Sequence, residues 1–193
     1  MALSLVPMTE LDAVNLMLES IGEAPVNTLT NNGFDEAYIA RGMLHRASRN
    51  VQSKGLHCNS ETDYPLTPDG SGYLIVPTNV LDIDAVYTSD DVVQRGNRLY
   101  NRTDHTYEFT QVMKVDIVFF LAFEDLPEVV REYIAIMAGR RFQANAVGSK
   151  VLVEFTAADE MIARAEFLRK EMNNADTNLL EGPAVYPGLR RSI

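Results

Sequence analysis

The chain has 193 residues, of which 46% are hydrophobic and 23% are charged, so it is long enough and apolar enough to bury a core. Acidic residues outnumber basic ones by 27 to 17, and the formal net charge of −10 has the wrong sign for a general nucleic-acid binder. The longest strongly apolar run, near Ile117–Phe123, is too short to span a membrane, and we expect no secretion signal because residues 1–7 lack a basic region. A single cysteine, Cys58, excludes an internal disulfide and a thiolate metal cage.

Two helices are predicted in residues 1–55. Thr9 is a suitable N-cap for the first helix, whose apolar residues recur at helical spacing up to Gly22: Leu11, Val14, Leu18 and Ile21. After a polar turn, the second helix is expected over about residues 35–54. Its acidic residues lie at the start, its basic residues lie toward the end, and Gly55 follows it, which is the arrangement that the helix dipole and a C-terminal cap favour.

Between residues 56 and 123 the hydrophobic period changes from that of a helix to that of a strand. Strands are predicted at 73–76, 80–87 and 112–123, and a hairpin is predicted at 92–101, where two short strands flank Gly96-Asn97. In the strand at 80–87, Asp82 and Asp84 point away from the apolar face. The region has four basic and ten acidic residues, and its net charge of −6 makes it the most acidic part of the chain.

Helical spacing returns after residue 124. Pro127 suits the first turn of a helix capped by Asp125, and the stretch to Asn145 is apolar nearly all round, which is typical of a buried helix. A fourth helix is expected over about residues 149–174. Residues 177–193 contain Gly182-Pro183 and Pro187-Gly188, which indicate an extended arm because proline interrupts a helix.

These patterns predict an α+β fold, a four-helix bundle with an inserted antiparallel β-sheet region and an extended C-terminal arm. The expected segments are an N-terminal helical pair over 1–55, the inserted β region over 56–123, a C-terminal helical pair that completes the bundle over 124–176, and the arm over 177–193.

Candidate catalytic residues are few. Neighbouring residues on an extended chain point in opposite directions, so His57-Cys58 is better explained by a partly buried loop thiol than by a metal or Cys–His site. Asp82 and Asp84 share one face of a strand at a spacing that glycoside hydrolases use, but any alternating surface strand gives this pattern, and the chain has no Trp to form a sugar-stacking floor. We therefore predict no catalytic site, no metal and no cofactor.

A basic stripe runs along the second helix. Arg41, His45 and Arg49 are spaced four residues apart and share one face. Such a stripe can bind an acidic partner or a phosphate, and it can equally be the solvent side of an amphipathic helix. One hypothesis is therefore a cytosolic regulator that binds a protein partner through this face.

The run Ser20-Ile21-Gly22-Glu23-Ala24-Pro25-Val26, which follows the first helix, is specific rather than generic. It occurs together with Ala13-Val14-Asn15, with Arg49-Asn50-Val51-Gln52-Ser53-Lys54-Gly55, and with Leu126-Pro127-Glu128 and Arg131. In these segments the chain resembles the tail tubular protein A family, the adaptors or gatekeepers of T7-like short-tailed bacteriophages.

The resemblance implies a non-enzymatic structural protein of the virion tail, assembled in the host cytoplasm. It would form a homo-oligomeric ring, a dodecamer, between the portal protein and the nozzle (tail tubular protein B). The ring would extend the DNA ejection channel without binding the DNA specifically and without contacting a membrane. The alternative is a virion-associated polysaccharide hydrolase that uses surface carboxylates.

Partner contacts are expected at two places on the chain. One is the basic stripe of the second helix, and the other is the arm, whose spaced apolar and basic side chains suit a crevice between subunits. The residues are Arg41, His45, Arg49, Leu180, Tyr186, Leu189, Arg190 and Arg191. Asp90 and Asp91 are expected to face the channel, where they would repel DNA.

Overall fold

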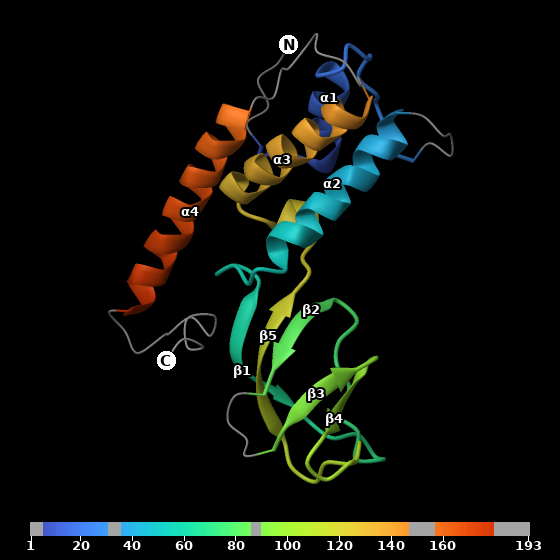
Figure 1. The fold of residues 1–193 in the computed structure, drawn as a ribbon, viewed down its shortest axis with the longest axis vertical. Coiled ribbons are helices and arrows are strands. Elements are labelled where there is room, and N and C mark those ends of the chain that lie inside the picture. The colour runs from blue at the N-terminus through green and yellow to red at the C-terminus, as the bar shows by residue number, and fades with distance from the viewer. Residues whose placement is uncertain (1–5, 31–35, 86–89, 147–156, 180–193) are drawn as a thin grey trace. The chain divides into compact units, whose positions relative to one another are not determined.

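The computed structural model describes residues 6–30, 36–85, 90–146 and 157–179, and it combines helices with antiparallel sheets (Figure 1). The chain divides into two compact units. The helical unit consists of the described parts of residues 1–48 and 123–193, and the β unit consists of residues 49–122. The predicted α+β class is confirmed.

Helix α1 (Glu10–Glu19) begins with a complete capping box. The Thr9 hydroxyl accepts a hydrogen bond from the Asp12 N–H at 3.1 Å, and the Asp12 carboxylate accepts one from the Thr9 N–H at 3.0 Å. Asp12 therefore fills the position that Glu or Gln usually occupies. These hydrogen bonds, from the side chain and then from the backbone of Thr9, hold the pKa of Asp12 below its ordinary value.

Helix α3 (Glu128–Ala146) packs against α1 and against α4 (Ala157–Leu179). The Tyr133 ring stacks on Phe167 with 5.1 Å between centroids, and the Gln143 side chain donates to the Ser20 carbonyl at 3.1 Å. The predicted burial of this helix is confirmed for Val130, Tyr133, Ile134, Ala135, Met137, Ala138 and Phe142. The remaining elements of the helical unit are η1 (Phe123–Asp125) and most of α2 (Glu36–Gln52).

Two predicted helix ends differ from the structure. Asp125 does not cap α3, because it lies in the 3-10 turn η1 and the helix begins at Glu128, directly after Pro127. Helix α4 continues to Leu179, three residues into the expected arm. The expected start of this helix, at about residue 149, lies outside the described residues.

The β unit contains a three-stranded antiparallel sheet with the order β1-β5-β2 and a separate two-stranded hairpin. The sheet strands are β1 (Ser60–Leu66), β2 (Val80–Asp84) and β5 (Met113–Phe119). The hairpin, β3 (Val92–Arg95) and β4 (Arg98–Asn101), confirms the prediction from Gly96-Asn97, and Gly96 adopts the positive φ of 65° that its turn needs.

The predicted strand pattern differs from the structure. The strand expected at 112–123 is shorter, because β5 ends at Phe119 and Phe123 lies in η1. Residues 73–76 were predicted as a strand, but they form only isolated bridges, Tyr73 with Glu108 and Ile75 with Arg98. The segment pairs at single positions with β4 and with the loop that follows β4. Strand β1, which the periodicity did not reveal, contains Pro65 and a register shift near Asp63, whose φ is +56°. Both features break the alternation, and an edge strand tolerates them.

The core of the β unit lies where the sheet and the hairpin pack together, and its buried residues are Leu66, Leu74, Val76, Leu99, Val115 and Ile117. Side-chain hydrogen bonds join the segment near the start of this unit to the segment near its end. The Gln52 amide donates to the Leu121 carbonyl at 3.0 Å and accepts from the Leu121 N–H at 2.8 Å. Buried Asn59 adds hydrogen bonds to the carbonyls of Gln52 and Phe119, at 3.1 and 2.7 Å.

Candidate interaction surfaces

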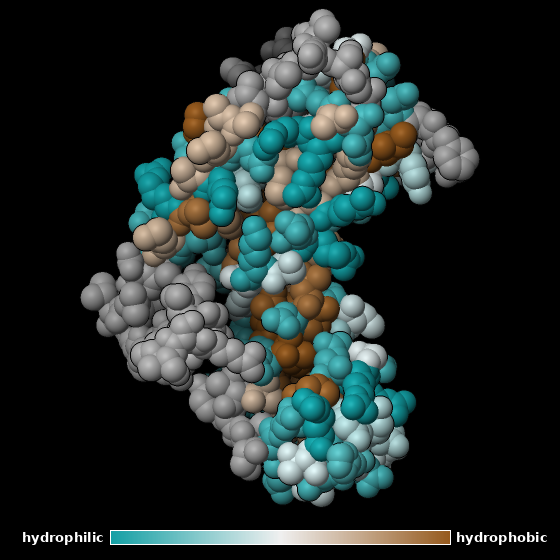
Figure 2. Space-filling model, viewed as in Figure 1, coloured by the Kyte–Doolittle hydropathy of each residue, from teal (hydrophilic) through white to brown (hydrophobic). Residues whose placement is uncertain are grey.

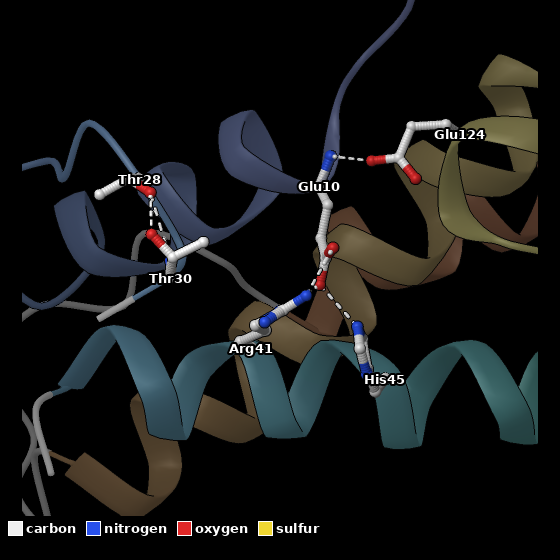
Figure 3. A network of polar contacts seen from close by, with 6 residues as sticks. All are labelled: Glu10, Thr28, Thr30, Arg41, His45 and Glu124. Atoms are coloured by element: carbon white, nitrogen blue, oxygen red, sulfur yellow. Dashed lines mark hydrogen bonds and ion pairs between the residues drawn. The ribbon is translucent and has the colours of Figure 1, made fainter. Parts of the chain in front are cut away.

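The basic stripe of α2 is partly committed to a contact within the helical unit. Glu10, the first residue of α1, accepts a hydrogen bond from Arg41 Nε at 2.8 Å and lies 2.5 Å from His45 Nε2 (Figure 3). The Glu10 N–H donates to the Glu124 carboxylate at 3.1 Å. Arg41 and His45 thus meet at one carboxylate, which joins α1 to α2.

This contact changes the ionisation of its members. Burial acts to raise the pKa of Glu10, but the hydrogen bonds from Arg41 and His45 outweigh it, and the pKa lies below its ordinary value. The hydrogen bond to Glu10 raises the pKa of Arg41. Glu10 therefore stays ionised to a lower pH than an ordinary glutamate.

Arg49, the third residue of the stripe, does not join the Glu10 contact. It belongs to the β unit, where its guanidinium lies 4.7 Å from the centroid of the Phe120 ring. The structure therefore brings two of the three basic residues together and places the third on an aromatic ring.

Asp90 and Asp91 lie at the base of the β3–β4 hairpin. The buried side chain of Asn101 donates to Asp90 at 3.3 Å and to Asp104 at 3.0 Å, and Asp91 forms an ion pair with Arg102 at 3.0 Å. Both aspartates therefore have a local role in ordering the hairpin.

The arm residues Leu180, Tyr186, Leu189, Arg190 and Arg191 lie outside the described residues. Asp82 and Asp84 are exposed on β2, and Cys58 is half-buried. In the described part of the chain, no group of three His, Cys, Asp or Glu residues is placed to hold a metal ion. The described helices include none that is both long enough and apolar enough to cross a membrane.

A buried arginine, which the resemblance included, has a structural role that the periodicity of the sequence did not indicate. Arg131, on α3, donates to the carbonyls of Leu126 and Met8 at 2.6 and 2.8 Å and also to the carbonyl of Glu124. It therefore holds η1 and the segment before α1 against α3. Its partner Met8 lies 123 positions away in the sequence, so no local pattern could have revealed the contact.

Comparison with known proteins identifies the family. The family model described as tail tubular protein matches residues 11–177, which include parts of both units. The chain is also 33% identical over 168 residues to tail tubular protein A of Klebsiella phage KP34, covering 86% of this chain and 89% of that protein. The chain belongs to the tail tubular protein family. It is thus a structural component of a phage tail, and the resemblance predicted from its sequence is confirmed.

In this tail tubular protein, the segments that carry the resemblance make internal hydrogen bonds. Asn15 binds the backbone of Val26, Gln52 binds the backbone of Leu121, and Arg131 binds three carbonyls. These residues secure the loop after α1, the chain ends of the β unit and the start of α3.

Proposed function

We propose that this tail tubular protein forms the adaptor ring, a dodecamer, that joins the portal protein to the tail nozzle. The observation that carries the proposal is the family match over residues 11–177, which spans both compact units rather than one shared module. The ring extends the channel through which the genome leaves the virion.

The division of the chain supplies separate surfaces for such a ring. We propose that the four helices act as one bundle, in which α3 packs on α1 and α4 and the Glu10 contact joins α2. The β unit, folded around its own core, is then available for contacts with ring neighbours or with the nozzle. The arm, with Leu180, Tyr186, Leu189, Arg190 and Arg191, is the segment we assign to the portal.

The charge of the chain suits a DNA conduit. Each copy carries a net charge of −10, and a ring of such copies repels a polyanion that moves along its axis. We place Asp90 and Asp91 on the channel side, where their like-charge rings act on passing DNA over about 8 Å at physiological salt.

We also propose that the protein has no hydrolase activity. In glycoside hydrolysis one carboxyl group must stay protonated as the general acid, which needs a desolvated site, whereas Asp82 and Asp84 are both exposed. Purified protein is expected to release no reducing sugar from host capsule or from oligosaccharides. Release that Asp82→Asn or Asp84→Asn abolishes would establish the enzyme instead.

The decisive experiment measures molar mass by light scattering, for the purified protein alone and after mixing with the portal. We expect a ring-sized increase in mass on the portal, and electron microscopy of the complex should show a ring with a central channel. A protein that leaves the mass of the portal unchanged would refute the adaptor function.

A further inference from the structure

The β3–β4 hairpin places two like charges side by side. Arg95 and Arg98 are directly opposite each other in its register, on either side of the Gly96 turn, so their side chains share one face. Like charges at directly opposite positions destabilise a hairpin. Both side chains are exposed, and the surface of this part of the unit is largely hydrophilic (Figure 2).

Aromatic rings hold the two guanidinium groups in place. Arg95 lies 3.7 Å from the centroid of the Tyr100 ring, and Arg98 lies 4.5 Å from that of Tyr73. Tyr107, which is 37% exposed, packs against Tyr100 with 4.8 Å between centroids. An arginine laid on a ring keeps its N–H groups available at the edge of its plane, and Tyr and Arg are the residues enriched at protein interfaces.

Neither of these arginines is neutralised within the described residues. Within residues 56–123 the two other Lys or Arg residues are paired, Arg102 with Asp91 at 3.0 Å and Lys114 with Asp63 at 4.0 Å. For Arg95 and Arg98 the described part of the chain supplies stacking and no carboxylate within 4.0 Å. We call Arg95, Arg98, Tyr73, Tyr100 and Tyr107 the arginine–tyrosine face.

The sheet of the same unit carries a like-charge pair of the opposite sign. Asp84 of β2 lies directly opposite Asp116 of β5, so the two carboxylates share one face of the sheet. Asp82, two residues earlier on β2, points to the same side. Asp82 and Asp84 are exposed and form no ion pair within the described residues. We call these three residues the acidic sheet face.

We propose that in the tail ring the arginine–tyrosine face of one copy binds the acidic sheet face of the next copy. The contact reduces the repulsion within both like-charge pairs at once. Two guanidinium groups on neighbouring strands of one copy meet carboxylates on neighbouring strands of the next copy. The two faces differ, so the contact is heterologous, and a heterologous contact closes into a ring when the rotation between successive copies closes, as it does in the proposed dodecamer. This inference rests on the proposed ring.

The charge of the chain favours a protein partner over DNA at this surface. Within the described residues the arginine–tyrosine face has two arginines without an ion pair, whereas the acidic residues Asp91, Asp104 and Glu108 lie in the same stretch of the chain as Tyr100 and Tyr107. A phosphate backbone would meet these carboxylates, while the carboxylates of a folded neighbour can be directed to the two arginines alone.

Charge reversal with rescue tests the contact. Arg95→Glu/Arg98→Glu and, separately, Asp82→Arg/Asp84→Arg should each raise the protein concentration needed for ring formation on the portal by about tenfold or more. The variant with all four changes should recover assembly. Arg46→Glu/Lys54→Glu, which alters the same amount of charge at two exposed residues, is the matched control and should assemble like the wild type. Normal assembly by either reversed pair, or no recovery in the fourfold variant, overturns the proposal.

A disulfide test separates this contact from the ring itself. In a Cys58→Ser background, chains with Arg98→Cys are mixed with chains with Asp84→Cys, and cross-linked dimers are expected from the mixture but not from either variant alone. A cross-link formed within one chain that carries both cysteines, instead of between chains, contradicts the proposal. A wild-type chain that forms no ring on the portal refutes the proposed function, whereas a ring without the cross-link refutes only this contact.

Binding of a short duplex DNA, measured by fluorescence anisotropy, provides the remaining comparison. The wild type and Arg95→Glu/Arg98→Glu should bind equally weakly. If the wild type binds the duplex and the variant does not, while both assemble alike, the arginine–tyrosine face is a DNA contact and the proposal is wrong.

Discussion

Asn15 and Val26 form a two-way hydrogen-bonded pair. The Asn15 amide donates to the Val26 carbonyl at 3.0 Å and accepts from the Val26 N–H at 2.8 Å. A side chain of α1 thereby takes the place of a backbone partner for the loop that follows the helix. Gly22, with a φ of +81°, turns the chain so that the loop can return to Asn15.

Replacing Asn15 by Ala should therefore lower the free energy of unfolding by about 1–3 kcal/mol, because the half-buried Val26 N–H and carbonyl lose their partner. Urea unfolding followed by circular dichroism measures the loss. Asn50→Ala, at an exposed position of α2, is the matched control and should change stability by less than about 0.5 kcal/mol. Equal effects of the two substitutions would contradict this role of Asn15.

Arg131→Met should be among the most damaging single substitutions. It keeps much of the side-chain volume but removes the donor to three carbonyls, and hydrogen bonds to charged groups contribute roughly 1.5–3 kcal/mol each. We expect at least about 3 kcal/mol of destabilisation in a denaturant titration. Arg140→Met, which breaks an ion pair with Glu160 at the surface, should cost no more than about 1 kcal/mol.

The Glu10 contact makes stability depend on pH in the acid range. Because the pKa of Glu10 is lower in the folded state than in the unfolded one, its contribution is fully present above the unfolded value, which is about 4.3, and is lost as the pH falls through the folded value. Asp12 acts in the same direction. Glu10→Gln should therefore lower the Tm at pH 6, and the difference from the wild type should shrink as the pH approaches 3. A difference that is constant over this range would rule out the linkage.

Removal of residues 180–193 should separate folding from assembly. Truncation after Leu179 leaves α4 intact, so the Tm should shift by only about a degree or two. Binding to the portal, measured by light scattering, should be lost if the arm is the portal anchor. A truncated protein that unfolds, or that still assembles on the portal, would contradict the assignment.

Asp90→Asn/Asp91→Asn tests the channel placement. The amide oxygens can still accept from Asn101 and Arg102, so the hairpin and assembly of the proposed ring should be unaffected, while two negative charges are lost from each copy. Weaker repulsion should slow genome release from assembled virions, measured by the fluorescence of a DNA-binding dye. Unchanged release kinetics would place these residues away from the DNA.

The elements that could be predicted from the sequence are those with local signals. The Thr9 capping signal, the apolar stripe of α1, the charge pattern of α2 and the Gly96-Asn97 turn all act over short stretches of sequence, and the structure contains each of these elements. Strand β1 could not be predicted in this way. Pro65 and the positive φ of Asp63 interrupt its alternation, and its place in the sheet depends on pairing with β5, about fifty residues later in the chain.

The candidate surfaces likewise combine features with a local sequence signal and features that depend on contacts between distant segments. The basic stripe of α2 was visible because Arg41 and His45 have helical spacing, but their carboxylate partner Glu10 lies 31 and 35 positions away. The pairing of Arg95 with Arg98 follows directly from the turn, whereas that of Asp84 with Asp116 requires the register of two distant strands. Ion pairs between distant segments are decided by packing, which local periodicity does not encode.

The hydrogen bonds between Gln52 and Leu121 have a consequence for how this protein can change. They hold Gln52, near the start of the β unit, beside Leu121, near its end, so the points at which the chain enters and leaves this unit are fixed to each other. A segment whose ends are fixed in this way can lengthen, shorten or be exchanged without altering the register of the helices on either side. A graft of another phage's β unit between positions 52 and 121 should therefore preserve the helical unit while changing the contacts of the proposed ring.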